Sequence, residues 1–164
     1  MARLPMAAVT RFCSTRWTDS SNLDVGGAVG TIFSIYEVAA GFETHLQHGR
    51  RQVAAGYVLY EPSTVLVLTL GRGVDMFVLE PNVGNFVRVA PQLQMPTRGK
   101  TYSVHEANRD SFLANYRRYL AQCRQQGYDS RYAGAMVADV HCVVLQGGIF
   151  FPHPPPKHRR ASCV

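Results

Sequence analysis

Asp19-Ser20-Ser21-Asn22 is the stretch of this 164-residue sequence whose residue types and spacing best suit chemistry. Two consecutive hydroxyl side chains stand between an acid and an amide, and Gly26 and Gly27 follow shortly after. In a glycine-flanked turn, hydroxyls and exposed backbone N–H groups can surround a phosphate. Ser and Asn also populate ordinary turns, so the stretch alone leaves both phosphate binding and a plain turn open.

Other candidate patterns each lack a part that their chemistry needs. His45 and His48 form an HxxH pair with no third metal ligand nearby in sequence, which is more typical of a polar loop than of a metal site. Asp139 and His141 are two residues apart, and side chains at that spacing on a helix do not face each other. We therefore expect His141 to be a core or interface histidine. Gly71-Arg72-Gly73 is too short for a dinucleotide-binding fingerprint.

The composition narrows the class of protein. Hydrophobic residues make up 46% and charged residues 17%, which is typical of one globular domain or a large piece of one. The formal net charge is +6, but three of the positive side chains lie in the last eight residues and the others are scattered. We therefore expect no nucleic-acid partner. The sequence has no membrane-spanning run, no signal-like apolar start and no CxxC pair, so we expect a cytoplasmic protein without disulfides.

The elements that must position these residues are mainly strands in the first part of the chain. Residues 30–38 have strand composition. Residues 57–70 read as a hairpin with a turn at Glu61-Pro62-Ser63, and residues 74–89 read as a second hairpin with a turn at 81–84. Residues 11–18 show no period at all. The sequence therefore predicts a sheet that is antiparallel in large part between residues 30 and 90.

Helices are predicted in the second part of the chain. A short strand at 101–104 precedes a helix over 111–126, with Asp110 as its N-cap and Gly127 at its C-terminal end. A second helix is predicted over 135–145, with Met136, Val137, Val140 and Val144 on one face, before the chain returns to a strand near residue 149.

Four long motifs occur in a recognisable order between about residues 20 and 150: SSNLDV…GAVGTIFSIYE, GRRQVAAGYVLYEPSTVLVLTLGRGVDMFVL, GKTYSVHEAN and SRYAGAMVADVH…GGIF. Together they resemble the central part of a bacterial-type class I fructose-1,6-bisphosphatase. The resemblance implies an α/β (α+β layered) sugar-phosphatase-like fold, here incomplete, with an antiparallel-rich sheet and at least two helices. It also implies a magnesium-dependent, homotetrameric enzyme that hydrolyses fructose 1,6-bisphosphate to fructose 6-phosphate and phosphate in gluconeogenesis.

The resemblance assigns roles to individual positions. Ser20 and Ser21 match the serines that hold the 1-phosphate, and Asn22 completes their motif. Arg131 matches the arginine that reaches the 6-phosphate of a neighbouring subunit, a bond for which the guanidinium fork is well suited. Tyr132 and Met136 match residues of the sugar site.

The same comparison shows what this sequence lacks. Thr15 and Thr18 stand where the family has two metal-binding aspartates; a one-residue gap could make Asp19 one carboxylate but not both. His105 replaces the family's asparagine on the 6-phosphate. The family's upstream glutamates and downstream lysine and glutamate have no counterpart in the sequence. We therefore expect no metal ligands, no intact catalytic residue and no hydrolysis. The alternative is that the chain is a non-catalytic fragment that associates with or regulates full-length phosphatase subunits.

Codon degeneracy offers an explanation for the missing aspartates. Cys13 to Asp19 can be written TGT TCG ACC CGC TGG ACG GAT, which from its third base reads Phe-Asp-Pro-Leu-Asp-Gly, the lost motif. Residues 160–164 permit a similar reading of Gly-Lys-Leu-Arg. Our hypothesis is an out-of-frame or non-native lead at 1–19, a central phosphatase-like part at 20–151 and a disordered, out-of-frame tail at 152–164.

Overall fold

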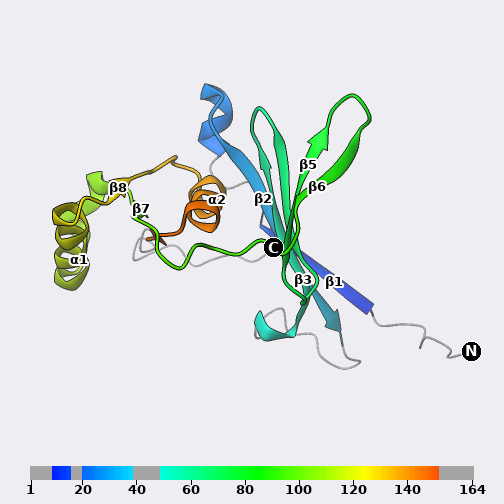
Figure 1. The fold of residues 1–164 in the computed structure, drawn as a ribbon, viewed down its shortest axis with the longest axis horizontal. Helices are drawn as coiled ribbons and strands as arrows, with labels where there is room; N and C mark the ends of the chain where they lie inside the picture. The colour runs from blue at the N-terminus through cyan, green and yellow to red at the C-terminus, as the bar shows by residue number, and fades with distance from the viewer. Residues whose placement is uncertain (1–8, 16–19, 39–48, 152–164) are drawn as a thin grey trace, which may run out of the picture. The chain divides into compact units, whose positions relative to one another are not determined.

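An antiparallel sheet of six strands forms the first of the two units into which the chain divides, residues 1–94 (Figure 1). The computed structural model describes residues 9–15, 20–38 and 49–151. Each strand pairs with the next along the chain, in the order β1-β2-β3-β4-β5-β6. The strands are β1 (Val9–Thr15), β2 (Val29–Val38), β3 (Gln52–Tyr60), β4 (Thr64–Thr69), β5 (Val74–Glu80) and β6 (Asn85–Ala90). Two 3-10 helices accompany them, η1 (Ser20–Val25) and η2 (Gly49–Arg51).

The two predicted hairpins are confirmed, and their turn residues explain them. Pro62 lies between β3 and β4, where its fixed backbone angle favours a tight turn. Between β5 and β6, Gly84 adopts a φ of +71° and its N–H donates to the carbonyl of Glu80 at 2.8 Å. The Asn82 amide donates to the Glu80 carboxylate at 2.8 Å in the same turn. These local turn interactions therefore set the strand register in both hairpins. The buried side chains of this unit include Val29, Ala54, Leu59 and Val67.

Strand β1 was not foreseen from the sequence pattern. Residues 11–15 show no alternation of apolar and polar side chains, yet β1 pairs antiparallel with β2 along its whole length, from Val9 opposite Val38 to Thr15 opposite Ile32. Pairing of this kind uses backbone groups, which every residue except proline supplies. Strand formation at this position therefore did not require a strand-like sequence period.

The second unit, residues 95–164, holds a small parallel sheet in the order β8-β7-β9. Its elements are β7 (Thr101–Ser103), η3 (Glu106–Ser111), α1 (Ala114–Gln125), β8 (Asp129–Ser130), α2 (Met136–Gln146) and β9 (Ile149–Phe150). Parallel neighbours need crossover connections, and α1 and α2 supply them. The sequence predicted both helices but not the parallel pairing. No helix in the described part of the chain is long and apolar enough to cross a membrane.

A core cluster of five buried residues holds α1 against β7. Its members are Tyr102, Val104, Phe112, Leu120 and Cys123. The predicted N-cap at Asp110 was wrong, because residues 106–111 form the separate turn η3 and the chain is extended at Phe112 and Leu113 before α1 begins. That extended step lets the Phe112 side chain enter the core. The predicted end is confirmed: Gly127 follows the helix with a φ of +70°.

The predicted helix over 135–145 is confirmed as α2, shifted by one residue. Its buried side chains are Val137, Ala138 and Asp139, whereas Met136 is 36% exposed. The expected apolar face was therefore only partly right, since an acid occupies one of the three buried positions. The predicted return to a strand is confirmed by β9.

Candidate functional site

Ser20 and Ser21 open η1, the turn that leads into β2. The next residue, Asn22, closes this turn: its side-chain amide donates to the carbonyl of Ala28 at 3.0 Å, and its own carbonyl accepts from the N–H of Gly27 at 2.7 Å. A Cβ at Gly27 would lie 3.2 Å from the Asn22 Cβ, so glycine permits the close approach. Asn22 therefore fixes the path of the backbone that carries the two serines.

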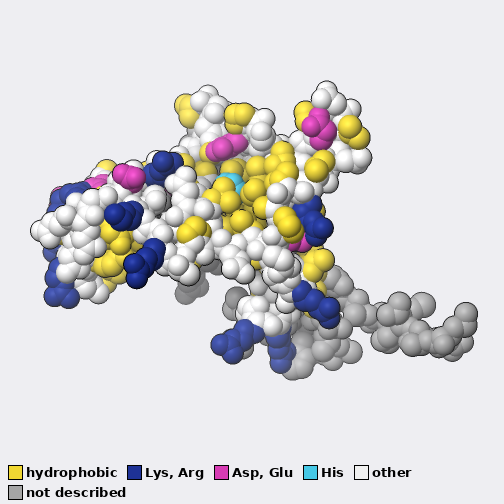
Figure 2. All heavy atoms as spheres, in the orientation of Figure 1, with side chains coloured by type: hydrophobic (Ala, Val, Ile, Leu, Met, Phe, Trp, Pro, Cys, Tyr) yellow, Lys and Arg dark blue, Asp and Glu magenta, His cyan; other side chains and the backbone are white. Residues whose placement is uncertain are grey.

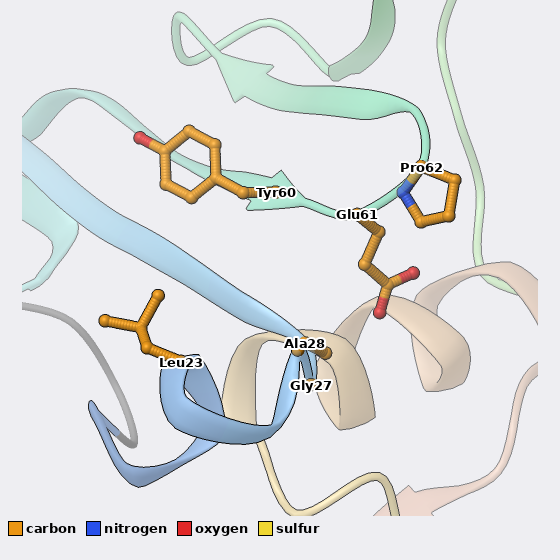
Figure 3. Close-up of a pocket in the computed structure, with 7 residues that line it drawn as sticks. Leu23, Gly27, Ala28, Tyr60, Glu61 and Pro62 are labelled. Carbon is orange, nitrogen blue, oxygen red and sulfur yellow. The ribbon is translucent and has the colours of Figure 1, made fainter.

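A cavity of about 360 Å³ lies beside this turn (Figure 3). Its walls are Leu23, Gly26, Gly27, Ala28, Tyr60, Glu61 and Pro62. The only charged side chain among them is the carboxylate of Glu61, which would repel a phosphate. The cavity lining therefore gives no support for a phosphate site at this position.

A second group of polar residues lies in the other unit, at the carboxyl ends of β7 and β8. The ring of His105 lies 4.9 Å from that of Tyr132, centroid to centroid, with the planes tilted by 52°. Nδ1 of His105 is 2.5 Å from the side-chain nitrogen of Asn108. The N–H of Asn108 also donates to the carbonyl of His105 at 3.1 Å. We call His105, Asn108, Arg131 and Tyr132 the imidazole cluster.

Parallel strand pairing brings the two halves of the imidazole cluster together. Tyr102 in β7 pairs with Ser130 in β8, and the N–H of Arg131 then donates to the carbonyl of Tyr102 at 2.9 Å. Arg131 and Tyr132 therefore leave β8 at the same sheet end at which residue 105 follows β7. The carboxyl ends of parallel strands are a common place for ligand binding. Arg131 is exposed and Tyr132 is 47% exposed, so both can be reached from solvent.

The acid next to the imidazole cluster is already engaged. One carboxylate oxygen of Glu106 accepts a hydrogen bond from the buried Tyr102 hydroxyl at 2.8 Å, and the other pairs with Arg124. This ion pair offsets the negative charge of Glu106, which would otherwise weaken anion binding at His105. Figure 2 shows other Lys and Arg side chains around α1, where Arg117 and Arg118 are exposed.

Asp139 is a residue of this region whose role the sequence did not indicate. Its side chain is 2% exposed, and Oδ1 accepts a hydrogen bond from the backbone N–H of Ala133 at 2.8 Å. The predicted absence of an Asp139–His141 dyad fits this geometry, because the carboxylate reaches back along the chain. His141 is half-buried. The sequence did contain one hint of this role, an acid in the first turn of a mostly apolar helix.

The residues that the structure describes do not fit a magnesium site. Thr15 ends β1 at one aspartate position of the resembled motif, and a neutral hydroxyl is a poor substitute for a carboxylate on Mg²⁺. Thr18, Asp19, His45 and His48 lie outside the described residues. Within the described residues, no three or more His, Cys, Asp or Glu side chains are grouped so that they could hold a metal ion.

The sequence-predicted residues thus fall into two groups. Ser20 and Ser21 belong to the first unit, whereas Arg131, Tyr132, Met136 and His105 belong to the second. Within the second unit, His105 and Tyr132 are in contact, Arg131 is anchored beside them, and Met136 begins α2. A guanidinium, an imidazole and a phenol at one sheet end can bind an anion such as a phosphate monoester. They do not by themselves supply the charge stabilisation that phosphoryl transfer needs.

Two family models match the chain, one for each unit. Residues 13–91 match fructose-1-6-bisphosphatase, N-terminal domain, and residues 95–162 match fructose-1-6-bisphosphatase, C-terminal domain. The change from one match to the other falls at the division between the two structural units, at residues 94 and 95.

Curated relatives and solved structures carry the same family name. The chain is 46% identical over 133 residues to a fructose-1,6-bisphosphatase class 1 from Persephonella marina, covering 80% of this chain and 41% of the relative. A protein of the same name from Synechococcus elongatus is 45% identical over 137 residues, with 40% of its length covered. The structure of apo Leishmania major fructose-1,6-bisphosphatase has a TM-score of 0.80 and 32% identity, covering 86% of this chain and 50% of that one. The chain therefore spans two-fifths to one-half of the length of these proteins.

Proposed function

This chain belongs to the class 1 fructose-1,6-bisphosphatase family, and from that premise we propose that it binds a sugar phosphate without hydrolysing it. The activity of the parent family, as the resemblance implies it, is the hydrolysis of fructose 1,6-bisphosphate to fructose 6-phosphate and phosphate in gluconeogenesis. The parent reaction depends on magnesium and takes place in the cytoplasm. The ligand that we assign to this chain is the product, fructose 6-phosphate.

The observation that carries this proposal is the contact between His105 and Tyr132, with Arg131 anchored beside them. The cluster presents an exposed guanidinium, and the neighbouring Glu106 is neutralised by Arg124. Arginine binds phosphate oxygens through two parallel N–H groups, which gives both affinity and orientation. Tyr132 is 47% exposed, so its side chain can contact the sugar.

We expect hydrolysis to be lost because the residues next to the two serines cannot hold a metal ion. Thr15 and Thr18 occupy the positions of the two aspartates, and threonine hydroxyls do not carry the negative charge that holds Mg²⁺. Without the metal, an attacking water is not activated and the charge on the phosphoryl oxygens is not offset. The serines can still contact a phosphate, but that contact alone does not break the ester.

The test is calorimetric titration of the purified chain with fructose 6-phosphate, with fructose as the unphosphorylated control. Arg131→Lys keeps the charge but loses the planar fork, so we expect affinity to fall about tenfold or more. The matched control is Arg118→Lys on the exposed surface of α1, which should leave affinity unchanged. Every copy carries the substitution, so the test holds whether Arg131 contacts a ligand on its own chain or on a neighbour.

The same preparation is assayed for phosphate release from fructose 1,6-bisphosphate with magnesium and with EDTA. We expect no release above background in either condition. Magnesium-dependent release by the pure chain would overturn the claim that hydrolysis is lost. Equal affinity of the chain and its Arg131→Lys variant for fructose 6-phosphate would overturn the assignment of the binding site.

The alternative function is association with full-length phosphatase subunits, which the chain would inhibit or regulate through the face that carries Arg131. Two observations favour it: Arg131 is exposed, and edge strand β6 carries the exposed apolar side chains Phe86, Val87 and Val89. Exposed apolar side chains on an edge strand favour pairing with another chain. Co-purification with a tagged full-length class 1 enzyme tests this role, and recovery of the tagged enzyme alone would exclude it.

A further inference from the structure

Helix α2 starts without a capping side chain. Its N-cap is Ala135, which makes no side-chain hydrogen bond, so the first N–H groups of the helix lack the partner that Ser, Thr, Asp or Asn would supply. The acid in the first turn is Asp139. A negative charge is favourable at this end of a helix. The Asp139 carboxylate nevertheless reaches beyond the helix, to the N–H of Ala133.

The segment between β8 and α2 is held on both sides of Tyr132 by hydrogen bonds that its backbone N–H groups donate. On one side the N–H of Arg131 donates to the carbonyl of Tyr102 at 2.9 Å. On the other side the N–H of Ala133 donates to Oδ1 of Asp139 at 2.8 Å. Gly134 then turns the chain with a φ of +77°, and the following Ala135 is fully buried. The two anchors fix the backbone from which the Tyr132 ring reaches His105.

Packing alone does not account for an acid at position 139. The side chain is 2% exposed, and its Oδ2 atom has no hydrogen-bond partner. Burial of a polar oxygen without a partner costs free energy, and an apolar side chain would avoid that cost. The gain that remains is the hydrogen bond that Oδ1 accepts from the N–H of Ala133.

We propose that Asp139 is a positioning residue, which holds Arg131 and Tyr132 in the arrangement that binds the sugar phosphate. The inference rests on the proposed function for its ligand and on the Ala133 hydrogen bond for its mechanism. Asp139 acts through the backbone of the 131–135 segment and needs no contact with the ligand.

The distinguishing variants are Asp139→Asn and Asp139→Leu. Asparagine keeps Oδ1 as an acceptor and places its amide nitrogen where Oδ2 makes no hydrogen bond, so it should preserve the anchor. Leucine keeps the branch at Cγ but is larger and has no acceptor. Asp110, an exposed acid in η3, provides the matched controls Asp110→Asn and Asp110→Leu. Retained near-ultraviolet circular dichroism identifies the variants that are folded.

The first readout is the position of the segment, measured by NMR. In the unaltered chain the Ala133 amide should exchange with solvent at least tenfold more slowly than an unprotected amide, and the Tyr132 and His105 rings should show a nuclear Overhauser contact. The slow amide exchange and the contact between the rings should both persist in Asp139→Asn and be lost in Asp139→Leu. Fast exchange of Ala133 in the unaltered chain would overturn the proposal even where Asp139→Leu does not fold.

The second readout is affinity for fructose 6-phosphate. We expect Asp139→Asn to bind within about threefold of the unaltered chain and a folded Asp139→Leu to bind at least tenfold more weakly. Equal weakening by both variants would show that the acid serves something other than the anchor and would overturn the proposal. If the unaltered chain does not bind, the proposed function fails, and the NMR signs alone then decide whether Asp139 positions the segment.

Discussion

Nδ1 of His105 lies 2.5 Å from the side-chain nitrogen of Asn108, so one nitrogen of the imidazole is already engaged inside its own turn. With the amide as donor, Nδ1 accepts and the proton of the neutral ring is on Nε2. Nε2 is then the nitrogen that can donate to a ligand. Histidine at position 105 therefore supplies an Nε2 donor where the resemblance places the family's asparagine.

The first prediction concerns what this histidine contributes to binding. Its Nε2 donor and the ring that lies 4.9 Å from the Tyr132 ring would both be lost in His105→Ala. We expect this variant to bind fructose 6-phosphate about tenfold more weakly than the unaltered chain, because a hydrogen bond to a charged group is lost.

Calorimetry at pH 7 on both proteins measures the effect. Equal affinities of the two proteins for fructose 6-phosphate would show that His105 does not contact the phosphate.

The second prediction tests the core beneath the imidazole cluster. Leu120 is 2% exposed and belongs to the core cluster with Tyr102, so Leu120→Ala should lower the free energy of unfolding by about 2–5 kcal/mol. Leu113 precedes α1 and is 69% exposed, and Leu113→Ala should change it by less than about 0.5 kcal/mol. Urea unfolding followed by circular dichroism compares the pair. Similar losses in the two variants would mean that α1 does not pack on β7 through Leu120.

How much of this could be predicted from the sequence depended on whether the determinants were local. The hairpin turns at Pro62 and Gly84 are local, and both were predicted correctly. Strand β1 was missed because it pairs through its backbone with β2, which no side-chain pattern records. The start of α1 was misplaced because burial of Phe112 in the core, a tertiary effect, interrupts the helical path.

The imidazole cluster was predictable only in part, for a related reason. Resemblance to the family pointed to Arg131, Tyr132 and His105 one by one. Their proximity depends on the parallel pairing of β7 with β8, which joins segments separated by a whole helix. Asp139 could not be found in this way, since its partner is a backbone N–H six residues earlier rather than a side chain in a motif.

The third prediction follows from Tyr57, a half-buried phenol in the six-stranded sheet. Burial raises the pKa of Tyr57 from 10.0 to about 12. Between these two pH values the folded chain keeps a proton that the unfolded chain loses, so the free energy of unfolding should fall as the pH rises from about 10 to about 12. Below pH 10 the contribution is fully present.

Tyr57→Phe removes the ionisable group and should make this decline shallower. Urea unfolding at pH 9.5 and pH 11.5 on both proteins gives the comparison, and each protein serves as its own reference at the lower pH. Tyr119, whose pKa is also raised by burial, is present in both proteins and does not contribute to the difference. An equal decline in both would place the Tyr57 hydroxyl in contact with water.

The last prediction concerns the origin of Thr15 and Thr18, and it is made at the level of DNA. Tryptophan has the single codon TGG and every threonine codon begins with AC, so the bases shared by Trp17 and Thr18 must read GAC in the shifted frame, an aspartate codon. The other positions of the motif are permitted by codon choice rather than forced. An inserted base just before Ser20 would therefore replace both aspartates while leaving the serines and everything after them in frame.

Resequencing the genomic DNA across the codons for residues 13–21 decides between two origins. We expect one base to be absent from the corrected sequence, which would then encode Asp-Pro-Leu-Asp-Gly-Ser-Ser and restore both carboxylates. The binding function proposed above would in that case belong to an altered copy of a magnesium-dependent enzyme. If the base is present and the shifted frame does not encode the motif, the threonines are native to the gene, and selection for binding without hydrolysis becomes the explanation for their presence beside an intact serine pair.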